Sequence, residues 1–221
     1  IPVPFKTDNT DLTNAYQISI NLCGDSWIGY FSPRDNKWNE ASNTTTFFFS
    51  EGWVNLMYEY AITNIFAPWI QLKNINMSGE NPNKEMYAIA QISKIMGLHR
   101  STDKFGPIPY KQVGNGSFTV EYDSQESVYR SFFEELDEAV TVLYDFYMKA
   151  NNTVPMASDV VYEGDVTEWI RLANSLMLRL AIRVRYADEI LARTYAEKAI
   201  KNPIGVMESI DDMAKMNRGA N

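Results

Sequence analysis

Apolar side chains recur every three or four positions along most of this 221-residue chain, and this spacing constrains the fold more than any other feature. One face of an α-helix repeats at that interval, whereas a half-buried strand alternates at every second residue. Convincing strand-type alternation is absent. The pattern predicts an all-α chain of stacked antiparallel helical hairpins, similar in architecture to tetratricopeptide repeats, although the sequence contains no clean repeat consensus.

Capping residues and prolines predict where the helices begin and end. The expected helices cover residues 9–31, 51–68 with a kink at Pro68 and resumption near Trp69, 82–99, 124–147, 166–186 and 188–201. Ser50, Asn81, Asp123 and Asp165 stand where an N-terminal cap is needed, because their side chains accept hydrogen bonds from the first helical amides. Residues 32–46 are polar and are expected to form a loop.

The expected helix over residues 166–186 carries leucines and other apolar side chains around nearly its whole circumference. Such a helix is expected to be central and largely enclosed. Arg179 and Arg183 lie four residues apart on one side of it, and an enclosed guanidinium without a partner is costly. We therefore predict that both arginines form structural salt bridges.

Composition excludes several functional classes. Hydrophobic residues make up 45% of the chain and charged residues 22%, which favours a packed core over disorder. The formal charge of −8 repels nucleic acid, so we expect no nucleic-acid partner. Apolar runs are far shorter than the roughly 20 residues of a membrane-spanning helix. The single cysteine, Cys23, lies within a helical pattern and is expected to be a small buried residue.

Three blocks carry a resemblance to a known family. The first is Asp103–Tyr110, with the sequence DKFGPIPY; the second is Tyr122–Glu126 with Tyr129 and the stretch 136–139; the third runs from Asp159 through Trp169 to ANSLMLRLAIR at 173–183. Together and in this order they resemble the SusD/RagB family of outer-membrane nutrient-binding proteins, in particular its second SusD-like branch. Pro107 departs from the family, where an acidic residue is usual. Physically, all three blocks also serve a scaffold of caps, stiff loops and core side chains.

The resemblance implies a SusD-like fold and a role in nutrient capture. Because family members are usually longer, we expect residues 1–221 to form one helical domain, the amino-terminal half of a longer protein. The family implies that this protein sits on the cell surface of a Gram-negative bacterium, held at the outer membrane by a lipid anchor not present in this chain. It further implies an oligosaccharide or other nutrient as ligand and a SusC-like TonB-dependent transporter as partner.

The segment 26–39 is the candidate ligand site, because it mixes aromatic side chains with polar groups that need not be buried. Sugars present hydroxyl edges and weakly apolar C–H faces, which suit exposed aromatic planes beside hydrogen-bonding side chains. We predict that Tyr30 and Trp38 stack on the ligand, while Arg34, Asp35 and Asn39 form hydrogen bonds with it. In the competing interpretation, Trp27 and Tyr30 face the core and the rest is ordinary loop.

Catalysis has little support in the sequence. His99 is the only histidine and is expected to be a surface or capping residue, so we predict no metal site and no cofactor. The adjacent acidic pairs 134–135 and 211–212 are interpreted as solvated charge. We predict no catalytic residue. Two alternatives remain: a helical-repeat adaptor that grips a protein or peptide, and an all-helical glycoside hydrolase, which would need two carboxylates facing one cleft.

Overall fold

The computed structural model describes residues 17, 22, 24–25, 27–32, 34, 46–48, 50–156 and 159–215. The chain divides into two compact units, residues 1–68 and residues 69–221. The expectation that residues 1–221 are a single domain within a longer protein stays a prediction.

In the first unit, helix α2 spans Glu51–Ala61 and continues into a π-helical segment, η4, at Ile62–Phe66. Helix α3 follows at Ala67–Met77 and crosses the boundary between the units. Ser50 precedes α2 as expected, but its side chain makes no capping hydrogen bond. A proline ring crowds the carbonyl four residues earlier in an α-helix, and for Pro68 that residue lies in the π-helical segment η4. The expected interruption is therefore a π-helical segment ahead of the proline.

The first expected helix, 9–31, lies mostly outside the described residues. Within it, Gln17, Leu22, Gly24 and Asp25 have π-helical conformation, whereas residues 27–29 form a turn. The prediction that this helix reaches Phe31 is therefore wrong at its end.

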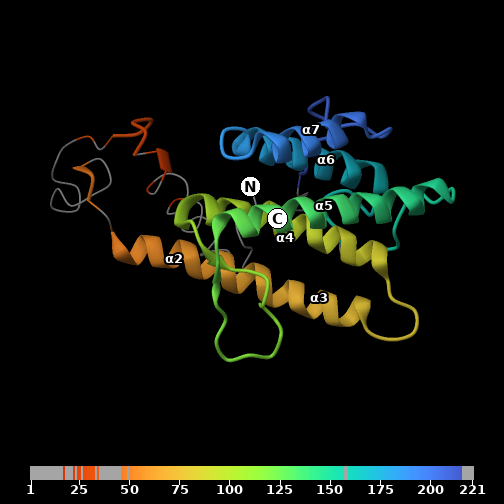
Figure 1. Ribbon diagram of the computed structural model, residues 1–221, viewed down its shortest axis with the longest axis horizontal. Helices are drawn as coiled ribbons and strands as arrows, with labels where there is room; N and C mark the ends of the chain where they lie inside the picture. Colours follow the sequence, from red (N-terminus) through yellow and green to blue (C-terminus); the bar gives the residue numbers. More distant parts are fainter. Residues whose placement is uncertain are drawn as a thin grey trace. The chain divides into compact units, whose positions relative to one another are not determined.

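The second unit consists of helices joined by two longer loops, at residues 106–124 and 149–165, and by a short turn between α6 and α7 (Figure 1). They are α4 (Lys84–Phe105), α5 (Gln125–Met148), α6 (Val166–Val184) and α7 (Glu189–Lys201). In the loop between α4 and α5, β1 (Ile108–Pro109) pairs antiparallel with β2 (Tyr122–Asp123). Apart from this two-residue ladder and an isolated bridge between Thr153 and Asp165, the described residues contain no strand pairing, which agrees with the all-α prediction.

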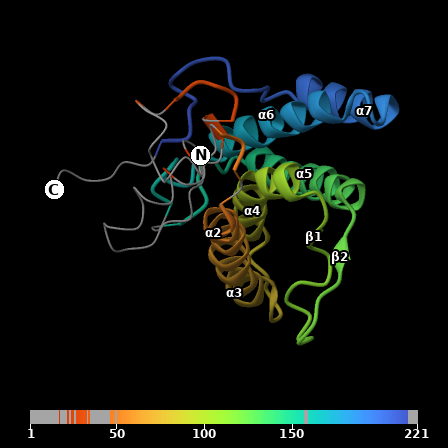
Figure 2. The ribbon, with the colours of Figure 1, turned by 90° about the vertical axis from the view of Figure 1, so that its left-hand side faces the viewer.

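Helices α4 and α5 form one antiparallel hairpin, and α6 and α7 form a second (Figures 1 and 2). Near the end of α4, Asp103 accepts a hydrogen bond from Tyr129 near the start of α5, while Lys94 in the middle of α4 pairs with Glu135 further along α5. This order of contacts requires opposite helix directions. Helix α5 packs on α6 and so joins the two hairpins. The predicted stack of antiparallel hairpins is confirmed.

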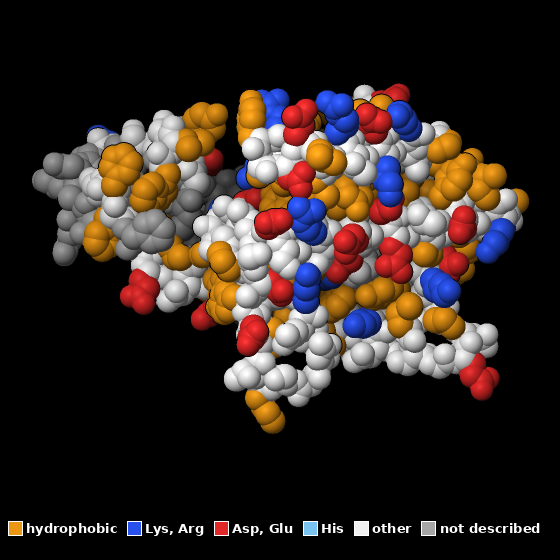
Figure 3. All heavy atoms as spheres, in the orientation of Figure 1, with side chains coloured by type: hydrophobic (Ala, Val, Ile, Leu, Met, Phe, Trp, Pro, Cys, Tyr) orange, Lys and Arg blue, Asp and Glu red, His pale blue; other side chains and the backbone are white. Residues whose placement is uncertain are grey.

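A shared apolar core holds the hairpins together. The fully buried side chains of α4, α5 and α6 include Ile92, Ile95, Leu98, Phe132, Phe133, Leu136, Leu143, Ile170, Met177 and Leu180. These residues follow the helical spacing of the sequence, and each fully buried side chain contributes roughly 1.5–3 kcal/mol relative to its exposed state. The opposite helix faces are charged. Figure 3 shows acidic and basic side chains interspersed over the region of α5 and α7, where Lys198 pairs with Asp137.

The cap of α6 matches the prediction, the cap of α7 was not among those predicted, and two earlier caps are shifted. Asp165 accepts hydrogen bonds from the amides of Thr167 and Glu168 at the start of α6, and Asp188 caps α7. Helix α4 is capped by Asn83 rather than Asn81, and it continues past His99 to Phe105. Helix α5 is capped by Ser124 rather than Asp123. The Asp123 carboxylate instead accepts hydrogen bonds from the amides of Tyr110 and Lys111, at 3.3 and 2.8 Å, and so fastens the β1–β2 loop.

Helix α6 is not enclosed all round. Ile170, Met177 and Leu180 are buried, but Ile182 remains 57% exposed and the side chains of Arg179 and Arg183 are also exposed. Arg183 forms the predicted salt bridge, with Asp103 at 2.8 Å. Among the described residues no carboxylate pairs with Arg179, so the prediction is wrong there. Because water solvates an exposed guanidinium, Arg179 does not require a partner.

Candidate functional site

The predicted ligand segment, 26–39, lies in the first unit and is described only in part. Tyr30 is 77% exposed and Arg34 is exposed. Asp35, Trp38 and Asn39 lie outside the described residues. The role of the five residues as one ligand site therefore stays a prediction.

A tight turn presents the aromatic side chains of this segment. The Trp27 amide donates to the carbonyl of Gly24 at 3.0 Å, and the Tyr30 amide donates to that of Asp25 at 2.9 Å. Gly29 adopts a φ of +78°, a left-handed conformation that glycine takes without a steric penalty. The turn leaves Tyr30 and Phe31 exposed rather than packed in a core.

An open groove of about 800 Å³ lies in the second unit, where the end of α4, the start of α5 and the α6–α7 turn meet. We call it the arginine groove; its polar and aromatic lining includes Asp103, Tyr129, Arg130, Arg183, Tyr186 and Asp188. Sequence reasoning did not identify it, because its walls come from four separate helices. Three of its residues nevertheless fall in the resemblance blocks: Asp103 in the first, Tyr129 in the second and Arg183 in the third.

One wall of the groove is an interlocked set of three side chains, which we call the groove network: Asp103, Tyr129 and Arg183. The Tyr129 hydroxyl donates to one Asp103 oxygen at 2.5 Å, and Arg183 pairs with the other oxygen at 2.8 Å. Arg183 also donates to the Tyr129 hydroxyl through its Nε, at 3.3 Å. Burial and the hydrogen bond to Asp103 raise the pKa of Tyr129 well above its usual range, so the phenol stays protonated.

The other wall carries a second cation between two carboxylates. The Arg130 guanidinium contacts Asp188 at 2.7 Å and Glu126 at 3.0 Å. Hydrogen bonding from the Leu191 amide, together with Arg130, lowers the pKa of Asp188. At the rim, the Arg185 guanidinium lies 4.3 Å from the centre of the Tyr186 ring, which is 87% exposed. The groove thus combines fixed ion pairs with an accessible aromatic ring.

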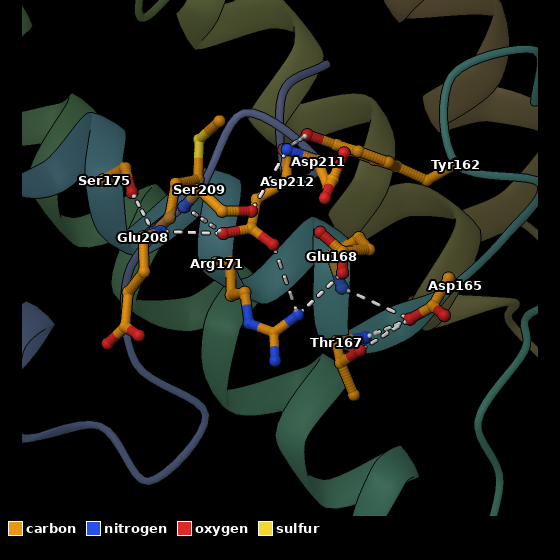
Figure 4. A network of polar contacts seen from close by, with 11 residues as sticks. Tyr162, Asp165, Thr167, Glu168, Arg171, Ser175, Glu208, Ser209, Asp211 and Asp212 are labelled. Atoms are coloured by element: carbon orange, nitrogen blue, oxygen red, sulfur yellow. Dashed lines mark hydrogen bonds and ion pairs between the residues drawn. The ribbon is translucent and has the colours of Figure 1, made fainter. Parts of the chain in front are cut away.

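A second polar cluster, shown in Figure 4, fastens the segment after α7 to α6. The Asp212 carboxylate accepts hydrogen bonds from the amides of Glu208 and Ser209 at 2.7 and 2.9 Å. Its backbone carbonyl accepts a hydrogen bond from the Tyr162 hydroxyl. Arg171 binds Glu168 at 2.6 Å and reaches Asp212 at 3.8 Å. Asp212 is thus committed to holding a chain segment, rather than being the freely solvated charge expected from the sequence. Its pKa is lowered by the two backbone amides.

A third set of polar side chains, the enclosed network of Lys94, Tyr110 and Glu135, lies between α4, β1 and α5. The Lys94 ammonium is 2.8 Å from Glu135, and the Tyr110 hydroxyl donates to the same carboxylate at 2.5 Å. The lysine side chain is 2% exposed. The interpretation of the 134–135 pair as solvated charge is therefore wrong for Glu135, because its partner lies on a different helix.

His99 also differs from expectation. It is buried within α4, its Nδ1 lies 3.2 Å from the Ile95 carbonyl, and its Nε2 is buried without a hydrogen-bond partner in the described structure. Burial lowers its pKa. The surface or capping role predicted for His99 is wrong because α4 extends past it.

The part of the chain that the structure describes contains no group of three or more His, Cys, Asp or Glu side chains placed to hold a metal ion. None of its helices combines the length and apolar character needed to span a bilayer.

Comparison with known families identifies the fold. Residues 3–221 match the model of the SusD-like family, described as SusD and RagB outer membrane lipoproteins. The chain belongs to the SusD-like family. The resemblance inferred from the three blocks is thereby confirmed. No protein of curated function matches the chain significantly.

Solved SusD-like structures share the fold. A chitin-binding SusD homologue from Flavobacterium johnsoniae is 35% identical, with a TM-score of 0.81 over 89% of this chain and 40% of that one. A SusD homologue from Bacteroides vulgatus is 30% identical, with a TM-score of 0.84 over 99% of this chain and 44% of that one. One from Bacteroides uniformis is 34% identical, with a TM-score of 0.78 over 91% and 40%. This chain therefore spans less than half the length of these SusD-like proteins.

Proposed function

We propose that this SusD-like protein captures a glycan or similar nutrient at the cell surface and passes it unchanged to a SusC-like TonB-dependent transporter. The observation that carries the proposal is the family match over residues 3–221. The likeness to a chitin-binding SusD homologue at 35% identity supports a carbohydrate as the ligand class. The family's description as outer membrane lipoproteins supports attachment to the outer membrane of a Gram-negative bacterium through a lipid anchor.

The proposed mechanism is binding and release, without a bond being broken. In the segment 26–39, Tyr30 and Trp38 stack on the apolar faces of sugar rings, while Arg34, Asp35 and Asn39 hydrogen-bond to hydroxyls. The 77% exposure of the Tyr30 side chain supports this role, because a ring that stacks on a ligand must be accessible. No catalytic residue is assigned.

Substitution within the segment tests the proposed site. Trp38→Ala is expected to weaken binding of a recognised oligosaccharide about tenfold or more, a loss of about 1.4 kcal/mol in binding free energy. Calorimetric titration of the intact gene product with neutral plant and host oligosaccharides provides the measurement. Phe118→Ala, in the α4–α5 loop, is the matched control, because this aromatic side chain is fully exposed in the other unit. Equal affinity of the Trp38 variant and the parent would remove Trp38 from the site.

A helical-repeat adaptor is the second candidate. The stacking of the α4–α5 hairpin on the α6–α7 hairpin favours it, since stacked hairpins form peptide-binding surfaces in repeat proteins. A peptide-array screen of the same protein discriminates the two functions. Peptide binding without any oligosaccharide binding would favour the adaptor.

A further inference from the structure

The arginine groove has the construction of a small-molecule site. Its volume of about 800 Å³ falls within the roughly 300–1,000 Å³ typical of ligand pockets. Its charged side chains are held in place before any ligand arrives, because the carboxylates orient both Arg130 and Arg183. Preorganised hydrogen-bonding groups reduce the entropy lost on binding.

We propose that the arginine groove is a second binding site for a neutral oligosaccharide, carried by the α4–α7 hairpins and additional to the segment 26–39. The proposal rests on the proposed glycan-capturing function and extends it to the helical unit. Its location follows from residues of four helices that converge on one hollow.

Donors and acceptors for sugar hydroxyls are present on both walls. A guanidinium has five N–H groups in a fixed plane. Arg183 uses its Nε for Tyr129 and its Nη2 for Asp103, and Arg130 uses its Nε for Glu126 and its Nη2 for Asp188. Each arginine thus keeps further N–H groups for a ligand, and each carboxylate oxygen can accept more than one hydrogen bond.

An aromatic ring at the rim suits a pyranose face. Tyr186 is 87% exposed, and the Arg185 guanidinium lies beside its ring. Ile182, 57% exposed, adds apolar surface to the same groove. Stacking of sugar C–H groups on such a ring, next to fixed polar side chains, is the combination that recognises carbohydrates.

The balance of charge indicates a neutral ligand. Three arginines, at positions 130, 183 and 185, and three carboxylates, at positions 103, 126 and 188, line the groove. Either an anionic or a cationic sugar would meet one set of like charges, a repulsion that disfavours both. A polyhydroxylated neutral chain can use donors and acceptors equally.

An NMR titration of the uniformly ¹⁵N-labelled, intact gene product tests the proposal. Four tetrasaccharides are used as probes. One is built from N-acetylglucosamine, and the other three are built from the repeating sugars of cellulose, starch and xylan. At least one probe is expected to shift the NMR signals of the backbone amides of residues 182–188. These shifts should titrate independently of those of the amides of residues 27–31. Tyr186→Ala should weaken the groove titration about tenfold while leaving the shifts at 27–31 unchanged. Ile190→Ala, 81% exposed and outside the groove lining, should change neither.

The outcomes separate the two proposals. Shifts at 27–31 with none at 182–188 would overturn the second site and leave glycan capture standing. Groove shifts that are unaffected by Tyr186→Ala would overturn the stacking at this site. Binding of none of the four probes, nor of the oligosaccharides in the calorimetric screen, would contradict the proposed function itself.

Discussion

The enclosed network and the groove network are built from the same chemistry, a carboxylate, a cation and a tyrosine hydroxyl, but they differ in exposure. In both, the cation lies 2.8 Å from the carboxylate and the hydroxyl donates to it at 2.5 Å. The Lys94 side chain is 2% exposed, whereas that of Arg183 is 47% exposed. Similar contacts therefore serve a core in one place and line a groove in the other.

Aromatic neighbours explain why the first network is closed. The Lys94 ammonium lies 4.1 Å from the Trp69 ring centre and 4.6 Å from that of Tyr110, so the rings take the place of water. Burial lowers the pKa of Lys94, and Glu135 opposes that shift. No comparable aromatic cage covers Arg183 in the described structure, and its remaining N–H groups stay available. Enclosure, rather than the identity of the charged groups, separates a structural ion pair from one that can meet a ligand.

The largest effect is expected from breaking the enclosed network. Glu135→Ala leaves the buried Lys94 ammonium without its carboxylate and should lower the free energy of unfolding by about 3–5 kcal/mol. Urea denaturation followed by circular dichroism measures it. Glu134→Ala, an exposed neighbour on the same helix, is the control and should change stability by less than about 0.5 kcal/mol. Similar losses in the two variants would contradict the enclosed character of the network.

Breaking the groove network should lower the free energy of unfolding by a smaller amount. Asp103→Ala removes the partner of Arg183 and Tyr129, but water can solvate the half-exposed arginine, so a loss of about 1–2 kcal/mol is expected. The same urea experiment measures it, with Asp137→Ala as the control, because its pair with Lys198 lies on the exposed surface. A loss as large as that of Glu135→Ala would erase the difference between the networks.

His99 lies on α4 between the two networks and supplies a pH test. Its pKa is lowered by burial, with Arg179 and Arg100 adding to the effect and Asp103 and the Ile95 carbonyl opposing it. Below about pH 6.5, the ordinary histidine value, the unfolded chain therefore binds more protons than the folded one. Stability should be fully present above that pH and fall on acidification.

The contribution of His99 is isolated by substitution. Unfolding free energies between pH 7 and 5, measured for the parent and for His99→Gln, should show a flatter pH dependence in the variant. Carboxylate titration dominates only at lower pH. Identical slopes in the two proteins would show that His99 protonates as easily when folded as when unfolded.

The smallest effect on stability is expected at the groove rim. Tyr186→Ala removes an 87% exposed ring and should change the free energy of unfolding by less than about 0.5 kcal/mol. Thermal unfolding compared with Ile190→Ala provides the measurement. A destabilisation above about 1 kcal/mol would mean that Tyr186 supports the fold rather than presenting a ligand surface.

Local signals in the sequence were enough to predict most of the helical fold. Asp165 caps α6 as predicted, since a cap depends only on residues two or three positions away. Asp188 caps α7 at the expected start of that helix, although it was not among the predicted caps. The caps of α4 and α5 were misplaced by one or two residues because several candidates adjoin each start. Asp123 is predicted to be a cap, but its carboxylate binds the amides of Tyr110 and Lys111 just after β1, a contact that only the folded chain creates.

The sites were much less predictable. The burial of Glu135 depends on Lys94, and the groove network joins residues of three helices, so neither has a local pattern in the sequence. Helical spacing suggested an enclosed α6, but it cannot reveal which face neighbouring helices leave uncovered. Of the predicted ligand residues, Tyr30 and Arg34 are accessible, while Asp35, Trp38 and Asn39 remain predictions.

The central claim, capture without turnover, is tested most directly by incubating the intact gene product with an oligosaccharide found to bind by calorimetry and then recovering the ligand. We expect saturable binding and complete recovery of the oligosaccharide at its original length by chromatography. Shorter products formed in proportion to protein concentration would contradict it and favour a hydrolase.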